Sequence, residues 1–148
     1  MNPVARVAPH SPVLTALCLA LALGPVAGAP AAAAERRLTA AEFEARVTGK
    51  TFYYNAGGQA YGAEQYKADR RVVWAFTGDD CKDGIWYEES GFICFRYDDN
   101  PDAPQCWTFF DRDGRLLARF RDDPAGAPLI AVQQSPKPMA CMGPDLGV

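Results

Sequence analysis

The sequence predicts a mainly β domain: a small antiparallel meander, forming a barrel or sandwich of roughly seven to eight strands after one short N-terminal helix. Two observations predict this fold class. From residue 51 onward, short runs of aromatic and β-branched residues alternate with turn residues, at about the 8–12-residue spacing typical of all-β domains. Four cysteines fall in the same region and allow two disulfides.

The helix is predicted by its start and stop signals. Thr39 is the expected N-cap, and Glu42 three residues later completes a capping box. Leu38 and Phe43 form the hydrophobic staple that accompanies such a box, and Gly49 ends the helix. A helix of about nine residues is not stable alone, so it must dock on an apolar surface. The preceding residues, 35–37, are expected to be a charged and frayed start.

The strands are expected where runs of apolar and aromatic residues are bounded by Gly, Asp, Asn or Ser. Ser90-Gly91 and Asp111-Arg-Asp-Gly114 are the hairpin signals between such runs. The sequence shows no internal repeat. The expected strand runs are 51–54, 59–68, 71–76, 85–88, 92–97, 106–110, 115–120 and 129–132.

Residues 1–34 predict a secretory signal peptide, followed by a single disulfide-stabilised β domain over 35–148. Arg6 supplies the early positive charge, and residues 13–23 form the apolar run. This run is about 11 residues long, short of the ~20 that cross a bilayer as a helix. Small residues follow, so cleavage is expected near Ala34. We therefore expect a periplasmic or secreted protein with no membrane span after signal removal.

The cysteines of the expected mature chain are Cys81, Cys94, Cys106 and Cys141. They allow three connectivities. We favour Cys94–Cys106, which would tie neighbouring strands together, and Cys81–Cys141, which would fasten the C-terminal tail. No pair has the close spacing of a zinc site or a redox motif, so we expect no metal and no cofactor.

Charge and histidine content exclude several functions. With 15 Lys and Arg against 18 Asp and Glu, the net charge of −3 argues against a nucleic-acid partner. The one histidine, His10, lies in the predicted signal peptide. A mature chain without histidine cannot build a Ser-His-Asp or Cys-His site, and no catalytic residue is assigned. Carboxylate chemistry, Lys or Tyr chemistry, and plain binding remain.

Aromatic residues supply the candidate ligand-binding site. Rings offer flat apolar contact to small apolar ligands or to glycans, although in a small barrel they also fill the core. Alternation along residues 85–88 puts rings on both faces of one strand, so some ring is expected to be exposed or to line a pocket. The candidate residues are Trp74, Trp86, Tyr87, Tyr97 and Trp107 as the lining, with Glu88 and Arg96 as polar contacts.

Carboxylates suggest an alternative site. A glycan hydrolase needs two carboxyl groups about 5–10 Å apart across one cleft. Glu64 and Glu88-Glu89 lie in strand-like sequence, but adjacent strand residues point to opposite faces, so Glu88 and Glu89 cannot form the pair. The acidic run 98–102 lacks the Gly and distal Glu of a calcium loop and is expected to be solvated.

Several short motifs carry a resemblance to a known group. They are Glu64-x-Tyr66, Arg71-Val-Val-Trp74, Cys81-x-x-Gly-x-Trp86-Tyr87, Ile93-Cys94-Phe95-x-Tyr97 and Cys106-Trp107. In this order they resemble small exported domains of unknown function from alphaproteobacteria, in which a helix ending in Gly-Lys-Thr (here residues 49–51) precedes a disulfide-bearing β-barrel. The resemblance covers residues 38–110 and implies compartment, fold and disulfides, without an activity. A more distant likeness, to periplasmic lysozyme-inhibitor barrels, rests on size, class and disulfides alone.

Together these observations predict a small, non-catalytic binding protein of the periplasm or the extracellular space, with an unknown ligand. One alternative is an interaction protein that inhibits a cell-envelope enzyme, as lysozyme inhibitors do. The other is a carboxylate-based glycan hydrolase. The expected partner is accordingly a small apolar or glycan ligand, or an envelope protein.

Overall fold

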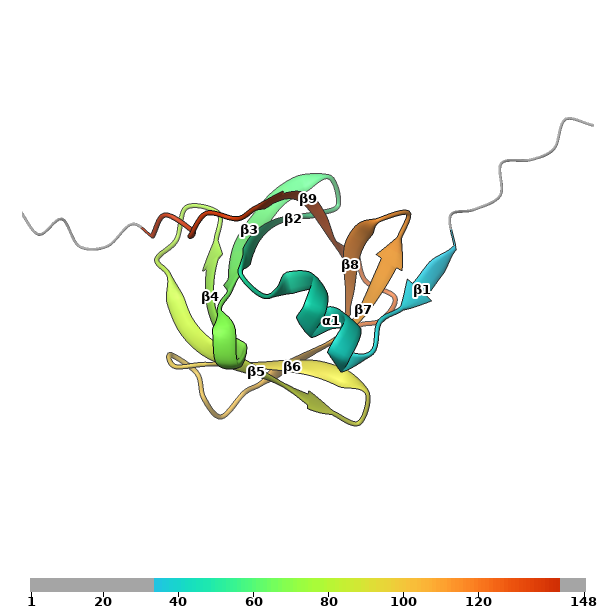
Figure 1. Ribbon diagram of the computed structural model, residues 1–148, viewed down its shortest axis with the longest axis horizontal. Coiled ribbons are helices and arrows are strands. Elements are labelled where there is room, and N and C mark those ends of the chain that lie inside the picture. Colours follow the sequence, from blue (N-terminus) through green and yellow to red (C-terminus); the bar gives the residue numbers. More distant parts are fainter. Residues whose placement is uncertain (1–33, 142–148) are drawn as a thin grey trace, which may run out of the picture. The chain divides into compact units, whose positions relative to one another are not determined.

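The computed structural model describes residues 34–141 (Figure 1). The predicted signal peptide, 1–34, lies outside the described residues except for its last position. The domain is mainly β, with one α-helix, as the sequence predicts. The strands are β1 Glu35–Arg37, β2 Lys50–Ala56, β3 Gln59–Tyr66, β4 Arg71–Phe76, β5 Lys82–Glu89, β6 Phe92–Tyr97, β7 Gln105–Arg112, β8 Arg115–Phe120 and β9 Leu129–Ser135.

Eight strands form a closed antiparallel barrel. From β2 to β9 each strand pairs with the next in sequence, and β9 pairs with β2 to close the ring. This is the predicted meander, and it takes the barrel form instead of the sandwich. The hairpins at Ser90-Gly91 and Asp113-Gly114 are confirmed, since all four residues have the positive φ that tight hairpin turns require.

Strand β1 was not expected, because its charged sequence Glu-Arg-Arg predicts a frayed start. It lies outside the ring on the edge of β7, where Glu35 pairs with Arg112. Strand β6 covers only the first part of that edge, up to Trp107, and so leaves backbone groups free for β1. The charges themselves help, because Glu35 accepts hydrogen bonds from Arg112 and from Arg119, the latter at 2.9 Å. These contacts hold the pKa of Glu35 below its usual range.

Helix α1, Ala40–Val47, begins with the predicted capping box. The Thr39 hydroxyl accepts from the Glu42 N–H at 3.3 Å, and the Glu42 carboxylate accepts from the Thr39 N–H at 2.9 Å. Phe43 and Val47 are fully buried. The ring of Phe43 packs against four aromatic residues from four strands, which are Tyr66, Trp86, Phe95 and Phe109. The helix therefore plugs the barrel, as Figure 1 shows with α1 inside the ring of strands.

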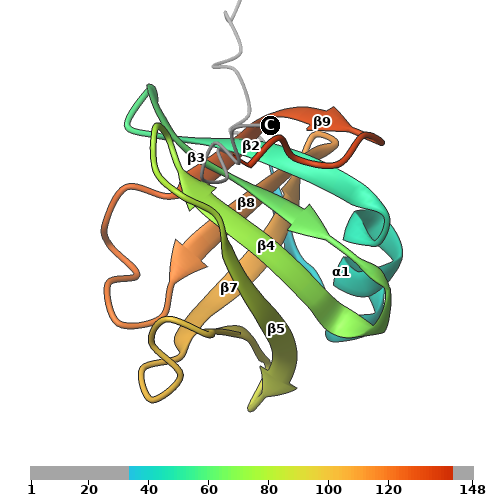
Figure 2. The same ribbon diagram turned by 90° about the vertical axis from the view of Figure 1, so that its left-hand side faces the viewer.

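The barrel has two different ends. At the helix end lie α1, the short 3-10 turn η1 (Ala68–Arg70) and the tight turns at 90–91 and 113–114. At the other end, here called the mouth, lie the β2–β3 turn and the longer connections 77–81, 98–104 and 121–128. Figure 2 shows α1 on one side of the barrel and these loops on the other.

Both predicted disulfides are confirmed. Cys94 and Cys106 face each other on the paired strands β6 and β7. Cys81 and Cys141 join the start of β5 to the segment after β9, across 60 residues of sequence. Each bridge restricts the unfolded chain, and the longer loop gives the larger entropic effect. In the part of the chain that the structure describes, no helix is long and apolar enough to cross a membrane.

Candidate functional site

A small cavity lies in the barrel interior on the mouth side of the core. Its walls include Trp74, Tyr97 and Trp107, three of the predicted ligand-binding residues. Most other wall residues are also aromatic or apolar; they are Tyr54, Tyr61, Tyr66, Phe76, Phe95, Phe109, Ala118 and Leu129, with Glu64 and Gln105 as polar members. The space open to the centre of a water molecule is about 30 Å³. That is enough for water or a small head group and too little for a whole drug-sized ligand.

Glu64 is the polar centre of this cavity. It is 4% exposed, and it is the only buried acidic residue among those the structure describes. One carboxyl oxygen, Oε1, accepts a hydrogen bond from the Tyr97 hydroxyl at 2.8 Å, and Oε2 accepts one from the Tyr66 hydroxyl at 3.2 Å. The Tyr54 hydroxyl lies 3.0 Å from that of Tyr66. Because Tyr66 has one proton to donate, it donates to Glu64 and accepts from Tyr54.

In the described part of the chain, the carboxyl group of Glu64 is contacted by hydroxyl groups and not by a cation. No Lys or Arg nitrogen in residues 34–141 lies within ion-pair distance of its carboxyl group. Burial disfavours the charged form and raises the pKa of Glu64 to about 8, although the hydroxyls of Tyr97 and Tyr66 act in the opposite direction. The carboxyl group is therefore mostly protonated at pH 7. Burial also raises the pKa of Tyr97 and of Tyr66.

Two glycines make room for the rings around Glu64. A Cβ atom at Gly62 would lie 2.6 Å from ring atoms of Trp74, and one at Gly84 would lie 2.8 Å from the ring of Tyr97. Both separations are shorter than side-chain packing allows. A β-bulge between β2 and β3 places Tyr61 as an extra residue next to Gly62, and the Tyr61 ring packs 5.9 Å from that of Trp74. The cavity wall thus depends on local backbone features of β3 and β5.

A second hollow of about 80 Å³ adjoins the cavity toward the mouth. The two spaces share Trp74, Phe76, Tyr97 and Gln105 as walls. The rest of the hollow comes from the start of β5 and from the loop 98–104, where Lys82 and Asp99 form an ion pair of 2.6 Å. A ligand coming from the mouth would meet this polar rim first and the aromatic walls next.

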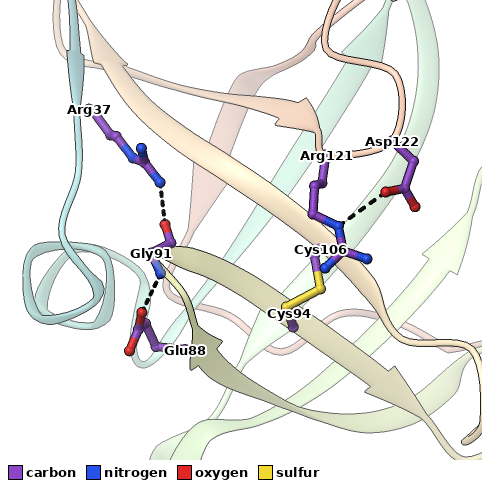
Figure 3. Close-up of a disulfide and its surroundings, with 7 residues drawn as sticks. All are labelled: Arg37, Glu88, Gly91, Cys94, Cys106, Arg121 and Asp122. Carbon is purple, nitrogen blue, oxygen red and sulfur yellow. Dashed lines mark hydrogen bonds and ion pairs between the residues drawn. A yellow bond between two sulfur atoms is a disulfide. The ribbon is translucent and has the colours of Figure 1, made fainter.

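The other predicted site residues lie elsewhere. Trp86 is buried at the helix end, against Phe43 and under the guanidinium group of Arg70 at 4.6 Å. Tyr87 and Arg96 point to the outer face of the barrel, since they alternate with inward-facing residues. Glu88 shares a face with Trp86 but lies beyond the barrel rim. Its carboxylate accepts from the Gly91 N–H at 2.6 Å and so caps a hairpin turn (Figure 3).

Glu64 is not one of the predicted site residues, although it is one of the carboxylates in strand-like sequence. The usable signal is alternation, because Glu64 shares its strand face with Gly62 and with Tyr66, which belongs to the core. A carboxyl group between two inward-facing positions is itself expected to face inward. Alternation alone does not show which face of β3 lines the barrel.

The Cys94–Cys106 disulfide lies on the outer face of the barrel, close to the β5–β6 hairpin turn (Figure 3). Nearby, the guanidinium groups of Arg37 and Arg121 lie 5.7 and 5.8 Å from the ring centroid of Phe92. The Glu89 carboxylate also lies within 4.8 Å of the two sulfur atoms. Because both cysteines are oxidised, they supply no thiolate to a metal ion, and this cluster is structural.

Comparisons with known proteins add no further identity. No protein-family model, no curated protein and no solved structure matches this chain. Of the features implied by the resemblance, the structure contains the disulfide-bearing β-barrel and the single helix. The functional argument therefore depends on the geometry of the barrel interior.

Proposed function

We propose that the protein is a small binding protein of the periplasm or the extracellular space whose mouth takes a small organic cation. The observation that carries this proposal is Glu64, a buried carboxyl group that has tyrosine partners and, among residues 34–141, no cation beside it. The two disulfides support the compartment, because such bridges persist in oxidising environments.

A cation suits this cavity for two reasons. An isolated buried carboxylate is costly, so Glu64 stays protonated until a positive charge arrives to pair with it. The faces of Trp74, Trp107 and the tyrosines carry negative quadrupole charge, which attracts ammonium groups. Glu64 and the surrounding rings therefore complement a small amine better than a neutral or anionic ligand.

The sizes of the two spaces limit the ligand. An ammonium head group fits the inner cavity of about 30 Å³ beside Glu64, where it would replace water. The apolar body would then lie in the outer hollow, between Trp74, Phe76 and Tyr97. We therefore expect a short amine with one small apolar substituent.

The hydrolase alternative has less support. Glu64 is the only carboxyl group that lines the inner cavity, whereas glycoside hydrolysis of the usual kind needs a facing pair. The hypothesis of an envelope-enzyme inhibitor stays a prediction, which a direct inhibition assay tests.

Nuclear magnetic resonance titration with benzylamine tests the proposal, with benzyl alcohol and benzoate as neutral and anionic controls. The chain has three tryptophans, and they act as internal reporters. We expect the indole signals of Trp74 and Trp107 to move, while that of Trp86 at the helix end stays in place. Affinity should rise as pH increases through about 8, because Glu64 must lose its proton to pair with the amine. Equal binding of benzyl alcohol, or shifts at Trp86 alone, would contradict the proposal.

Two variants, each with a matched control, test whether Glu64 and Tyr97 are responsible for amine binding. Glu64→Gln removes the charge and should abolish the preference for the amine, whereas Glu89→Gln, at an exposed acid, should not. Tyr97→Phe removes the hydroxyl that positions Glu64 and should weaken binding several-fold; Tyr87→Phe, on the outer face, serves as its control. If Glu64→Gln retains full amine affinity, the cation hypothesis is wrong.

A further inference from the structure

A groove opens at the helix end, where two neighbouring barrel strands separate. Strands β8 and β9 pair at two positions only, Leu117 with Ile130 and Ala118 with Leu129. Beyond these, β9 stays paired with β2 as far as Ser135, while β8 remains on β7. The gap between the diverging strands has a volume of about 390 Å³, within the range of small-molecule sites.

The floor of the groove is apolar. Phe52, Leu116 and Ala131 are inward-facing residues of β2, β8 and β9 and form part of the barrel core. Val132 stands at the side of the groove and is 54% exposed, the one large hydrophobic side chain so exposed among the described residues. Val132 therefore supplies most of the accessible apolar surface of the groove, above a floor of core side chains that are 1–7% exposed.

The rim of the groove is positively charged. Arg46 from α1, Lys50 from β2 and Arg115 from β8 line it, and no acidic residue of the described range 34–141 does, although the whole chain has a net charge of −3. Arg115 makes no ion pair with any residue in 34–141. One nearby acid, Asp111, forms an ion pair with Arg46, in which a carboxylate oxygen lies 2.5 Å from a guanidinium nitrogen.

The donors of Arg46 are directed into the protein, whereas Lys50 keeps free N–H groups. Its two terminal nitrogens donate to the Asp111 carboxylate and to the Gly114 carbonyl. Its Nε–H is buried and has no partner among the described residues, an arrangement that is costly in a folded protein. Lys50 donates to the carbonyl of Arg46 at 2.8 Å, which uses one of its three N–H groups. Lys50 and Arg115 thus keep donors for an acceptor that carries negative charge, while Arg46 contributes charge to the same rim.

We propose that this groove binds an organic anion with a short apolar body, such as a medium-chain carboxylate or an alkyl phosphate. The anionic group would lie among Arg46, Lys50 and Arg115, and the alkyl part would lie over Phe52, Leu116 and Val132. The groove and the mouth lie at opposite ends of the barrel, and the two proposals are independent of each other.

Isothermal titration calorimetry of the whole chain with sodium octanoate and with octyl phosphate tests the groove. Octyltrimethylammonium has a similar apolar body and the opposite charge, and inorganic phosphate has the charge without the body. We expect both octyl anions to bind, and the cation and free phosphate to bind at least tenfold more weakly. Equal binding of the octyl cation would overturn the proposal, as would a failure of both octyl anions to bind.

Variants at an exposed position avoid loss of folding. Arg115→Gln should weaken octanoate binding on the order of tenfold, the loss of one charge-assisted contact, and Arg115→Glu should weaken it further. Arg96→Gln and Arg96→Glu, on the exposed outer face of β6, are the matched controls. Thermal unfolding followed by circular dichroism verifies that all four variants fold. Unchanged affinity in Arg115→Glu would overturn the proposal, and so would binding of an acidic hexapeptide in preference to octanoate, which would indicate strand addition along β9.

Discussion

The two ends of the barrel differ in the polarity of the side chains that fill the interior. At the helix end, Phe43 fills the interior with an apolar ring that has no exposed surface. At the mouth, the interior instead contains Glu64, whose burial is unfavourable and whose hydrogen-bond partners among the described residues are tyrosine hydroxyls. Packing at the helix end therefore stabilises the fold, whereas burial of Glu64 at the mouth destabilises it. The fold alone does not need this polar group. Such a group is a reasonable candidate for function.

The largest expected effect is a loss of stability, and we compare it for a Phe→Ala substitution at each end of the barrel. Phe43→Ala should reduce the free energy of unfolding by about 3–5 kcal/mol, because it leaves a cavity among four aromatic rings and undocks α1. Phe76→Ala, at the half-buried mouth, should cost on the order of 1–2 kcal/mol. Urea denaturation measures both values. Equal losses would show that the mouth is packed as firmly as the helix end.

The next effect concerns the pH dependence of stability. The pKa of Glu64 is raised to about 8 by burial, so the folded protein keeps a proton that the unfolded chain loses near pH 4.5. The contribution of Glu64 to stability therefore decreases as pH rises from about 4.5 to about 8 and is constant above that. At about 1.4 kcal/mol for each pH unit, the total is on the order of a few kcal/mol.

Glu64→Gln isolates this contribution, since the amide keeps the shape and cannot ionise. The variant should gain stability over the wild type as pH rises from 5 to 9, as measured by thermal unfolding across that range. Glu89→Gln, at an exposed position, controls for general charge effects. Parallel stability curves for Glu64→Gln and the wild type would mean that Glu64 is ionised in the folded state and that another group compensates its charge.

The sequence predicted the features whose signals are local. The capping box at Thr39, the turn at Asp113-Gly114 and the meander order depend on residues close together in the chain. The Cys94–Cys106 pairing followed from the same neighbour relations, because these two cysteines lie on adjacent strands. The Cys81–Cys141 pairing spans 60 residues and followed only as the pair that remained.

The features that the sequence did not predict depend on closure of the barrel. Glu64 becomes buried only when β9 returns to β2 and encloses the inner face of β3. Strand β1 forms because β6 leaves part of the β7 edge free, and the groove exists because β8 and β9 diverge. No short stretch of sequence contains a signal for these contacts between distant strands. Trp86 and Tyr97 both lie in aromatic strand runs, so the sequence does not distinguish them. In the closed barrel, Trp86 packs against the helix residue Phe43 and Tyr97 lies beside Glu64.

The smallest expected effect tests whether local signals also determine local stability. Thr39→Ala removes the hydroxyl that accepts from the Glu42 N–H, and loss of an N-cap costs about 1 kcal/mol. Thr108→Ala on β7, whose hydroxyl makes no hydrogen bond among the described residues, is the matched control and should cost less. Hydrogen exchange should show faster opening of the first turn of α1 in Thr39→Ala and unchanged exchange around the mouth. If exchange instead rises around Glu64 as well, the two ends of the barrel open together, and the helix plug and the mouth form one cooperative unit.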